Sequence, residues 1–140
     1  MKEVVADTNV LVSALLTAPP SPPRIFLTKV VDGELRLVLS PRLLLEIVSV
    51  FSRPKLRLLI PESKISDLVT LLHQSARIVK PAFSIKACRD PKDDVVLESA
   101  IAGKVSAIIT GDEDLLALNP FRGTLPILTP AEFLSSLKSR

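Results

Sequence analysis

The chain has 140 residues, of which 47% are hydrophobic and 24% are charged, and its formal net charge is +3 at pH 7. This length fits a single domain over residues 1–140, and such a domain buries roughly 68% of its unfolded surface, so we expect one complete hydrophobic core. No apolar run approaches the roughly 20 residues that span a bilayer. The lone Cys88 excludes an intrachain disulfide and argues against a cysteine-based zinc site, and the modest positive charge permits a polyanionic partner without requiring one.

The first seven residues argue against a targeting segment. An acid stands on each side of the run Val4-Val5-Ala6, which is far too short for the apolar core of a signal peptide. A single cysteine also fits a reducing compartment. We therefore expect a cytoplasmic protein.

Short apolar runs alternate along the chain with longer segments of helical periodicity. The runs predict strands at 4–6, 35–39, 78–79, 107–109 and 127–128, and the longer segments predict helices at about 9–17, 22–32, 41–52, 62–76, 92–102, 113–118 and 130–138. The strand runs are continuously apolar, as expected when helices cover both faces of a parallel sheet. The sequence therefore predicts an α/β fold around a buried, mostly parallel sheet.

Glycines and prolines mark several expected helix ends. Gly33 and Gly103 stand where a left-handed C-terminal cap would end a helix, while Ser40-Pro41 and Thr129-Pro130 have the N-cap and N1 arrangement that starts one. The proline-rich segment 19–23 is expected to form a stiff connector whose end caps the next helix. A docking clamp for a partner is the less favoured interpretation of that segment.

Acidic residues cluster around the expected ends of two strands. Asp7 directly follows the first strand, Asp112 and Asp114 follow the strand at 107–109, and the helix that leads into that strand opens with Asp90, Asp93 and Asp94. Ligands of parallel sheets bind beyond the carboxyl ends of the strands, so these acids should gather at one edge.

The spacing of the acids on that helix calls for compensation. Asp90, Asp94 and Glu98 are spaced i, i+4, i+8 and so line one helix face, where like charges repel. The helix macrodipole explains an acid in the first turn, but it does not explain why Asp7 and Asp112 should converge there.

Glu46 stands out within the apolar helix expected at 41–52. Arg42, Glu46, Ser49 and Arg53 share one face, so a solvated stripe with an Arg42–Glu46 pair is the simplest explanation of Glu46 taken alone.

A group of close carboxylates is unfavourable unless the acids are protonated or bind cations. Hard oxygen ligands select Mg²⁺ or Mn²⁺ over zinc, and four acids could hold one ion tightly and a second ion together with substrate. Two ions roughly 4 Å apart would orient an attacking water and neutralise the leaving oxygen. This pattern predicts phosphodiester hydrolysis.

Other chemistries have little support. The only histidine, His73, lies in a helical pattern without an obvious nucleophile nearby, and the four glycines form no phosphate-binding loop. The best candidates for substrate contact are the basic residues Arg53, Lys55 and Arg57, although a solvated loop explains them equally well. Because tyrosine and tryptophan are absent, we do not expect a base-stacking platform.

Four motifs in this order resemble the PIN-domain family, in particular the small prokaryotic VapC-like toxins of toxin–antitoxin systems. The motifs are Asp7-Thr8-Asn9-Val10-Leu11-Val12-Ser13, Pro41-Arg42-Leu43-Leu44-Leu45-Glu46-Ile47, Cys88-Arg89-Asp90-Pro91-Lys92-Asp93-Asp94 and Thr110-Gly111-Asp112-Glu113-Asp114-Leu115-Leu116. The resemblance spans almost the whole chain.

The resemblance implies a metal-dependent nuclease whose acidic quartet falls on Asp7, Glu46, Asp94 and Asp112. It gives the orienting hydrogen-bond partners as Thr8, Asn9 and Thr110. The extra acids leave the register open: Asp93 could replace Asp94, Asp114 could share or replace the role of Asp112, and Asp90 could act from a second shell.

The resemblance also implies a three-layer, flavodoxin-like α/β/α fold, an RNA substrate, homodimerisation and an antitoxin that covers the site. The competing interpretations are a housekeeping RNA-processing nuclease, a flap-type DNase, and a PIN fold that binds RNA or protein without catalysis. A response-regulator receiver is disfavoured because no lysine follows the strand at 127–128.

Overall fold

The computed structural model describes residues 1–138, which form five strands and eight helices. In chain order the elements are β1 (Lys2–Ala6), α1 (Thr8–Leu16), α2 (Pro22–Val31), β2 (Leu35–Leu39), α3 (Pro41–Phe51), α4 (Pro54–Leu59), α5 (Glu62–Ser75), β3 (Arg77–Ile78), α6 (Pro91–Gly103), β4 (Ala107–Ile109), α7 (Glu113–Leu116), β5 (Ile127–Leu128) and α8 (Pro130–Lys138).

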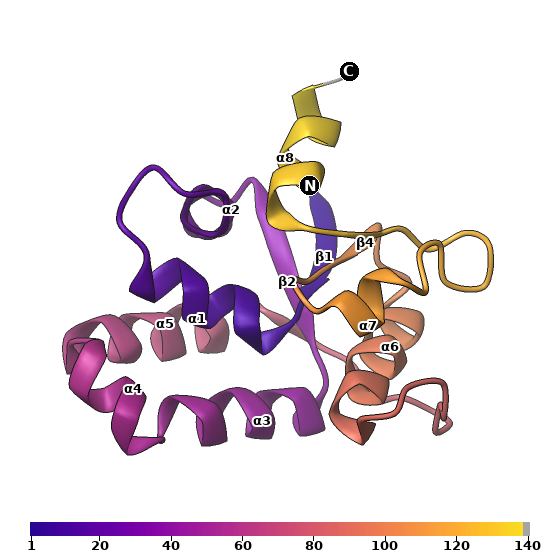
Figure 1. The fold of residues 1–140 in the computed structure, drawn as a ribbon, viewed down its shortest axis with the longest axis horizontal. Helices are drawn as coiled ribbons and strands as arrows, with labels where there is room; N and C mark the ends of the chain where they lie inside the picture. The colour runs from indigo at the N-terminus through magenta and orange to yellow at the C-terminus, as the bar shows by residue number, and fades with distance from the viewer. Residues whose placement is uncertain (139–140) are drawn as a thin grey trace.

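The strands form one parallel sheet in the order β3-β2-β1-β4-β5. Figure 1 shows the sheet between two helical layers, with α1 to α5 on one side and α6 on the other. Helix α6 packs across β1, β2 and β4, and β1 is completely buried over Val4 and Val5. The predicted α/β/α architecture is confirmed. Among residues 1–138, no helix is long and apolar enough to cross a membrane.

Local sequence explains where the helices begin. Ser40 accepts a hydrogen bond from the backbone N–H of Leu43, with Pro41 in the first turn, and Ser21 caps α2 in the same way. At α8, Thr129 and Glu132 cap each other's backbone N–H groups reciprocally. The predicted starts at 40–41 and 129–130 and the cap after the proline-rich connector are confirmed.

Helix α4 was not predicted, and the bounds of several elements, among them β1, β3 and α7, differ from the predicted ranges. The basic segment at 53–57 was expected as a loop, whereas residues from Pro54 form the short helix α4 with Arg53 as its extended N-cap. Proline is favoured at the first helical position, and this outweighs the polar composition of the segment. Strand β3 covers Arg77–Ile78, and the backbone N–H of Val79 still bonds to the carbonyl of Leu39.

Gly103 has a different role from the one predicted. Gly33 has the expected positive φ of 79°, but at the end of α6 the left-handed residue is Lys104, with φ 50°. Gly103 is the last helical residue, and a Cβ atom there would lie 2.7 Å from Cγ1 of Val38. A side chain is therefore excluded because the helix lies against β2, and not because of the backbone angle.

We expect Gly103→Ala to destabilise the protein by about 1–3 kcal/mol, because overpacking against Val38 outweighs the gain in helix propensity. Urea unfolding measures this. The matched test is the same substitution in a Val38→Ala background, where the cost should shrink. An equal cost in both backgrounds would show that steric overlap with Val38 is not the cause.

Candidate metal centre

Three carboxylates meet at the carboxyl edge of the sheet. Asp7 follows β1, Asp112 precedes α7, and Asp93 lies in the first turn of α6. One oxygen from each of these three lies within 4.8 Å of the others. Adjacent parallel strands β1 and β4 end side by side, and the crossover helix α6 begins at the same edge, so three distant segments deliver acids to one point.

Hydrogen bonds hold two of these acids in place. The hydroxyl of Thr110, which is fully buried, donates to Oδ2 of Asp7 at 2.9 Å and accepts from the backbone N–H of Asp112 at 3.0 Å. The side chain of Asn9 accepts from the backbone N–H of Gly111 at 3.4 Å. Thr110 and Asn9 therefore couple the two strand ends, in the orienting positions that the resemblance implied.

Glu46 enters the same cleft from α3. Its Oε2 accepts a hydrogen bond from the hydroxyl of Thr8 at 3.0 Å, across 38 residues of sequence. Its charge also raises the pKa of Asp7, so the two carboxylates sense each other. Glu46 is thus oriented toward the acids and is not an isolated solvated side chain, although it lies outside the group of three.

Burial and mutual repulsion shift the acids toward their protonated forms. Desolvation raises the pKa of Asp7 to about 6, opposed by the hydrogen bond from Thr110 and reinforced by Glu46 and Asp112. Desolvation, together with a hydrogen bond and charge repulsion from Asp112, raises the pKa of Asp93 to about 7. The cluster therefore favours a compensating positive charge.

Asp94 points away from this cluster. Its Oδ1 accepts two hydrogen bonds, each of 2.9 Å, from the backbone N–H groups of Ala87 and Cys88, and the residue is only 7% exposed. Glu98, one turn later, accepts from the backbone N–H of Ile85 at 2.8 Å. The face predicted to carry Asp94 into the site instead anchors the loop before α6.

Of these two neighbouring residues, it is therefore Asp93 that lies with Asp7 and Asp112. Neighbouring residues on a helix point about 100° apart, so Asp93 and Asp94 cannot both face the sheet edge. The structure does not bring Asp94, the acid preferred from the sequence, into the group of three, and the choice of ligand stays a prediction.

Two other candidate acids also have local roles. Asp90 is the N-cap of α6 and accepts from the backbone N–H of Lys92, while its side chain still lines the cleft. Asp114 is exposed and forms an ion pair with Arg89 at 3.0 Å. Neither is part of the group of three, whereas Asp112 is.

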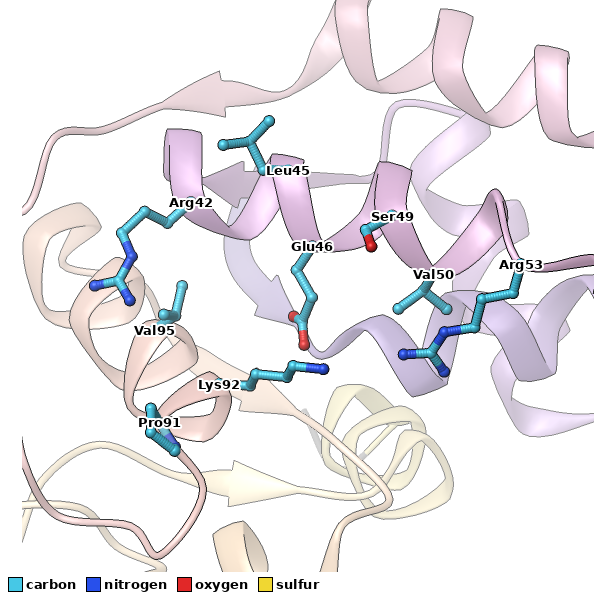
Figure 2. Close-up of a pocket in the computed structure, with 9 residues that line it drawn as sticks. All are labelled: Arg42, Leu45, Glu46, Ser49, Val50, Arg53, Pro91, Lys92 and Val95. Atoms are coloured by element: carbon cyan, nitrogen blue, oxygen red, sulfur yellow. The ribbon is translucent and has the colours of Figure 1, made fainter.

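The acids open into a cleft of about 550 Å³. Its basic lining comes from Arg53 and Lys55 at the start of α4 and from Lys92 on α6, while Arg57 does not line it. In Figure 2, the side chains of Lys92 and Arg53 extend toward the space beside Glu46. Lys92 was not singled out from the sequence, and the available clue was its place between the acids of the third motif.

The histidine and the cysteine, which could support other chemistries, lie outside the group of three. His73 is exposed on α5, beside the apolar surface of α3, as expected for a surface histidine. Burial and the neighbouring Asp94 raise the pKa of Cys88 to about 12, which keeps this thiol protonated. The charges of Asp93 and Asp112 also contribute to the raised pKa of Cys88, but neither Cys88 nor His73 belongs to the group of three.

The donor set suits a divalent cation with a preference for oxygen. Three carboxylates within 4.8 Å provide hard oxygen ligands, and the open cleft leaves room for water and a phosphate. The residues present therefore fit Mg²⁺ or Mn²⁺ better than a softer metal.

A parallel sheet with such acids at its carboxyl edge is the arrangement of a nuclease-type α/β domain. The model of the PIN domain family matches residues 3–114. The chain is also 32% identical to an uncharacterized protein of Methanocaldococcus jannaschii, MJ1680, over 97% of this chain and 92% of that protein. The chain belongs to the PIN domain family.

We expect the substitutions Asp93→Ala and Asp94→Ala to have opposite effects. Asp93→Ala removes a repelling charge, so it should leave the metal-free Tm unchanged or higher and abolish any rise with Mn²⁺. Asp94→Ala leaves two backbone N–H groups without their acceptor, which should cost about 1–3 kcal/mol while the Mn²⁺-dependent rise remains. Thermal unfolding with Mn²⁺ or EDTA measures both.

Asp94→Asn provides a milder control, because its amide oxygen still accepts a hydrogen bond. Loss of the Mn²⁺ response in Asp94→Asn, with the response retained in Asp93→Ala, would reverse this assignment.

The metal-free protein should become less stable as pH rises from about 5 to about 8. The folded-state pKa values of Asp7 and Asp93 lie above the usual value of 3.8, so the folded state binds more protons in this window. Their contribution is complete below the unfolded pKa and is lost as pH rises through about 6 and about 7.

Urea midpoints in EDTA across this range measure the effect, and Asp93→Asn should flatten the profile. A profile that is equally steep in wild type and Asp93→Asn would assign the pH dependence to other groups.

Proposed function

We propose that this protein is a divalent-metal-dependent endoribonuclease that hydrolyses RNA phosphodiester bonds. The observation that carries the proposal is the group of Asp7, Asp93 and Asp112 within 4.8 Å, beside basic residues in an open cleft. A protein that served only as a scaffold would gain nothing from keeping these mutually repelling acids together. Membership of the PIN domain family supports the nuclease class.

Asp7, Asp93 and Asp112 would hold the ion, with Glu46 beside them. Bound Mg²⁺ or Mn²⁺ would supply positive charge for the phosphate and for the water that attacks it. Thr110 fixes the position of Asp7, and Thr8 fixes that of Glu46, so the donor set needs little rearrangement before reaction. Glu46 is placed to hold a second ion or to orient water.

The basic side chains supply binding to the polyanion. Arg53, Lys55 and Lys92 line the cleft without belonging to the acidic group, and they suit phosphates on either side of the scissile bond. In the reaction, the water oxygen forms a bond to phosphorus, one ester P–O bond breaks, the water proton passes to a carboxylate or to solvent, and the departing oxygen takes up a proton.

The proposal also makes the protein the toxin of a toxin–antitoxin pair that acts on RNA in the cytoplasm. Apolar side chains also line the cleft and offer a surface for an antitoxin segment: Val12, Leu16, Leu56 and Leu59. The proposal also includes a homodimer, which rests on the resemblance to the PIN-domain family.

We expect purified protein to cut end-labelled single-stranded RNA with Mg²⁺ or Mn²⁺ and not with EDTA. Asp93→Asn should lower the rate by more than about 100-fold, because loss of even an outer partner of a metal ligand costs about 10–100-fold. Asp114→Asn is the matched control, since this acid pairs with Arg89 outside the group of three, and its rate should stay near that of wild type.

Matched single-stranded DNA separates a ribonuclease from a DNase. Absence of cleavage with every metal, together with no Mn²⁺-dependent rise in Tm, would overturn the catalytic proposal and leave a non-catalytic binding module. Cleavage without growth arrest on expression would retain the nuclease and overturn the toxin role.

A further inference from the structure

We propose that one flank of a single-stranded RNA lies on a basic track that leaves the acidic cluster between α3 and α6 and ends at Phe83. The proposal deepens and rests on the proposed nuclease function, because it concerns the same RNA. It assigns a substrate-binding role to Arg42, Lys86 and Phe83, which lie outside the cleft that holds the acids.

The track is a series of hollows that share lining residues. The cleft adjoins a groove of about 300 Å³ through Glu46, Arg53 and Lys92, and this groove is drawn in Figure 2. Arg42 and Pro91 also line the next hollow, of about 360 Å³. Arg42 lines the last one as well, of about 470 Å³, which reaches Phe83. The surface is therefore continuous from the acids to the loop before α6.

The charge of the track is positive where it meets solvent. Arg42 keeps 66% of its side chain exposed although it lies 3.7 Å from Glu98, and Lys80, Lys86 and Lys92 are exposed. Within residues 1–138, none of these three lysines forms an ion pair.

The acids beside the track are already engaged by the protein. Asp94 accepts two backbone hydrogen bonds, and Glu98 accepts one from Ile85 and faces Arg42. Both carboxylates are at least nine-tenths buried. Glu98 also lines the last two hollows, and Asp94 lines one of them. The exposed cations are therefore available to phosphates, whereas these two acids are already bound by backbone N–H groups or by Arg42.

Phe83 provides an aromatic face at the far end. It is 69% exposed, whereas Phe26, Phe51 and Phe133 are buried and Phe121 lies beneath the guanidinium of Arg122. An exposed ring beside a basic groove is suited to stacking a base of single-stranded nucleic acid. The absence of tyrosine and tryptophan had argued against such stacking, but a single well-placed phenylalanine suffices for one base.

The track extends to one side of the scissile bond. Glu113 on α7 is exposed and carries a charge that repels a phosphate backbone, whereas Asp114 is paired with Arg89. We therefore expect one flank of the RNA to contribute more to binding than the other.

The protein contains no tryptophan, so Phe83→Trp installs a single fluorescent reporter on the track. In an Asp93→Asn background with Mg²⁺, RNA of about 12 nucleotides should quench this reporter, while RNA of about 4 nucleotides should quench it weakly, since it can occupy the cleft alone. Leu58→Trp, on an exposed site of α4 that lines none of these hollows, is the matched control and should not respond.

Binding by fluorescence anisotropy tests the side chains directly. Phe83→Ala should weaken binding of the longer RNA by about fivefold or more, and Arg42→Ala should reduce the salt slope, −d log K/d log [salt], by about 0.7. Phe83→Trp should retain tight binding because the indole also stacks. Lys138→Ala, which removes a charge from α8, serves as the charge control.

The outcomes separate this inference from the nuclease proposal. Cleavage by wild type with no quenching at position 83 and no length dependence would overturn the track and retain the nuclease. Length-dependent quenching without cleavage would support the track as an RNA-binding surface and overturn the nuclease. Quenching of both reporters would indicate non-specific association and would also overturn the track.

Discussion

The structure depends on holding like charges together at the carboxyl edge of the sheet. Asp7, Asp93 and Asp112 come from segments far apart in the sequence, and burial, reinforced by repulsion between the acids, raises the pKa values of Asp7 and Asp93. The surrounding structure holds the acids together despite their repulsion. Strands β1 and β4 are buried side by side, and Thr110 after β4 donates a hydrogen bond to Asp7 after β1. A cation is the natural counterpart of this arrangement, because it turns a repulsive cluster into a binding site.

Helix α6 divides its acids between two tasks. Asp93 faces the sheet edge, while Asp94 and Glu98 hold the backbone of the preceding loop through its N–H groups. Adjacent aspartates thus have different partners: Asp93 joins the group of three acids and Asp94 binds the loop backbone. A substitution at Asp94 that abolishes activity is ambiguous for this reason, because it disturbs the loop and the start of the helix that carries Asp93.

Much of the architecture could be predicted because it depends on local patterns. Continuous apolar runs gave the five strands, and Ser40-Pro41 gave the start of α3. The expected helix at 92–102 could not show which of Asp93 and Asp94 faces the sheet edge. Its start is uncertain by a residue or two, and a shift of one residue exchanges the directions of these two side chains. The role of Gly103 depends on its contact with Val38, which is a tertiary feature without a local pattern.

The anchoring of the loop by Asp94 and Glu98 has a geometric consequence. It ties the segment that follows Phe83 to the same helix that carries Asp93, so the two ends of the track are connected through α6. With a base stacked on Phe83, the number of nucleotides to the scissile bond would be set by the span between them. Such an enzyme would cut at a fixed number of nucleotides from the stacked base, whatever the bases next to the scissile bond.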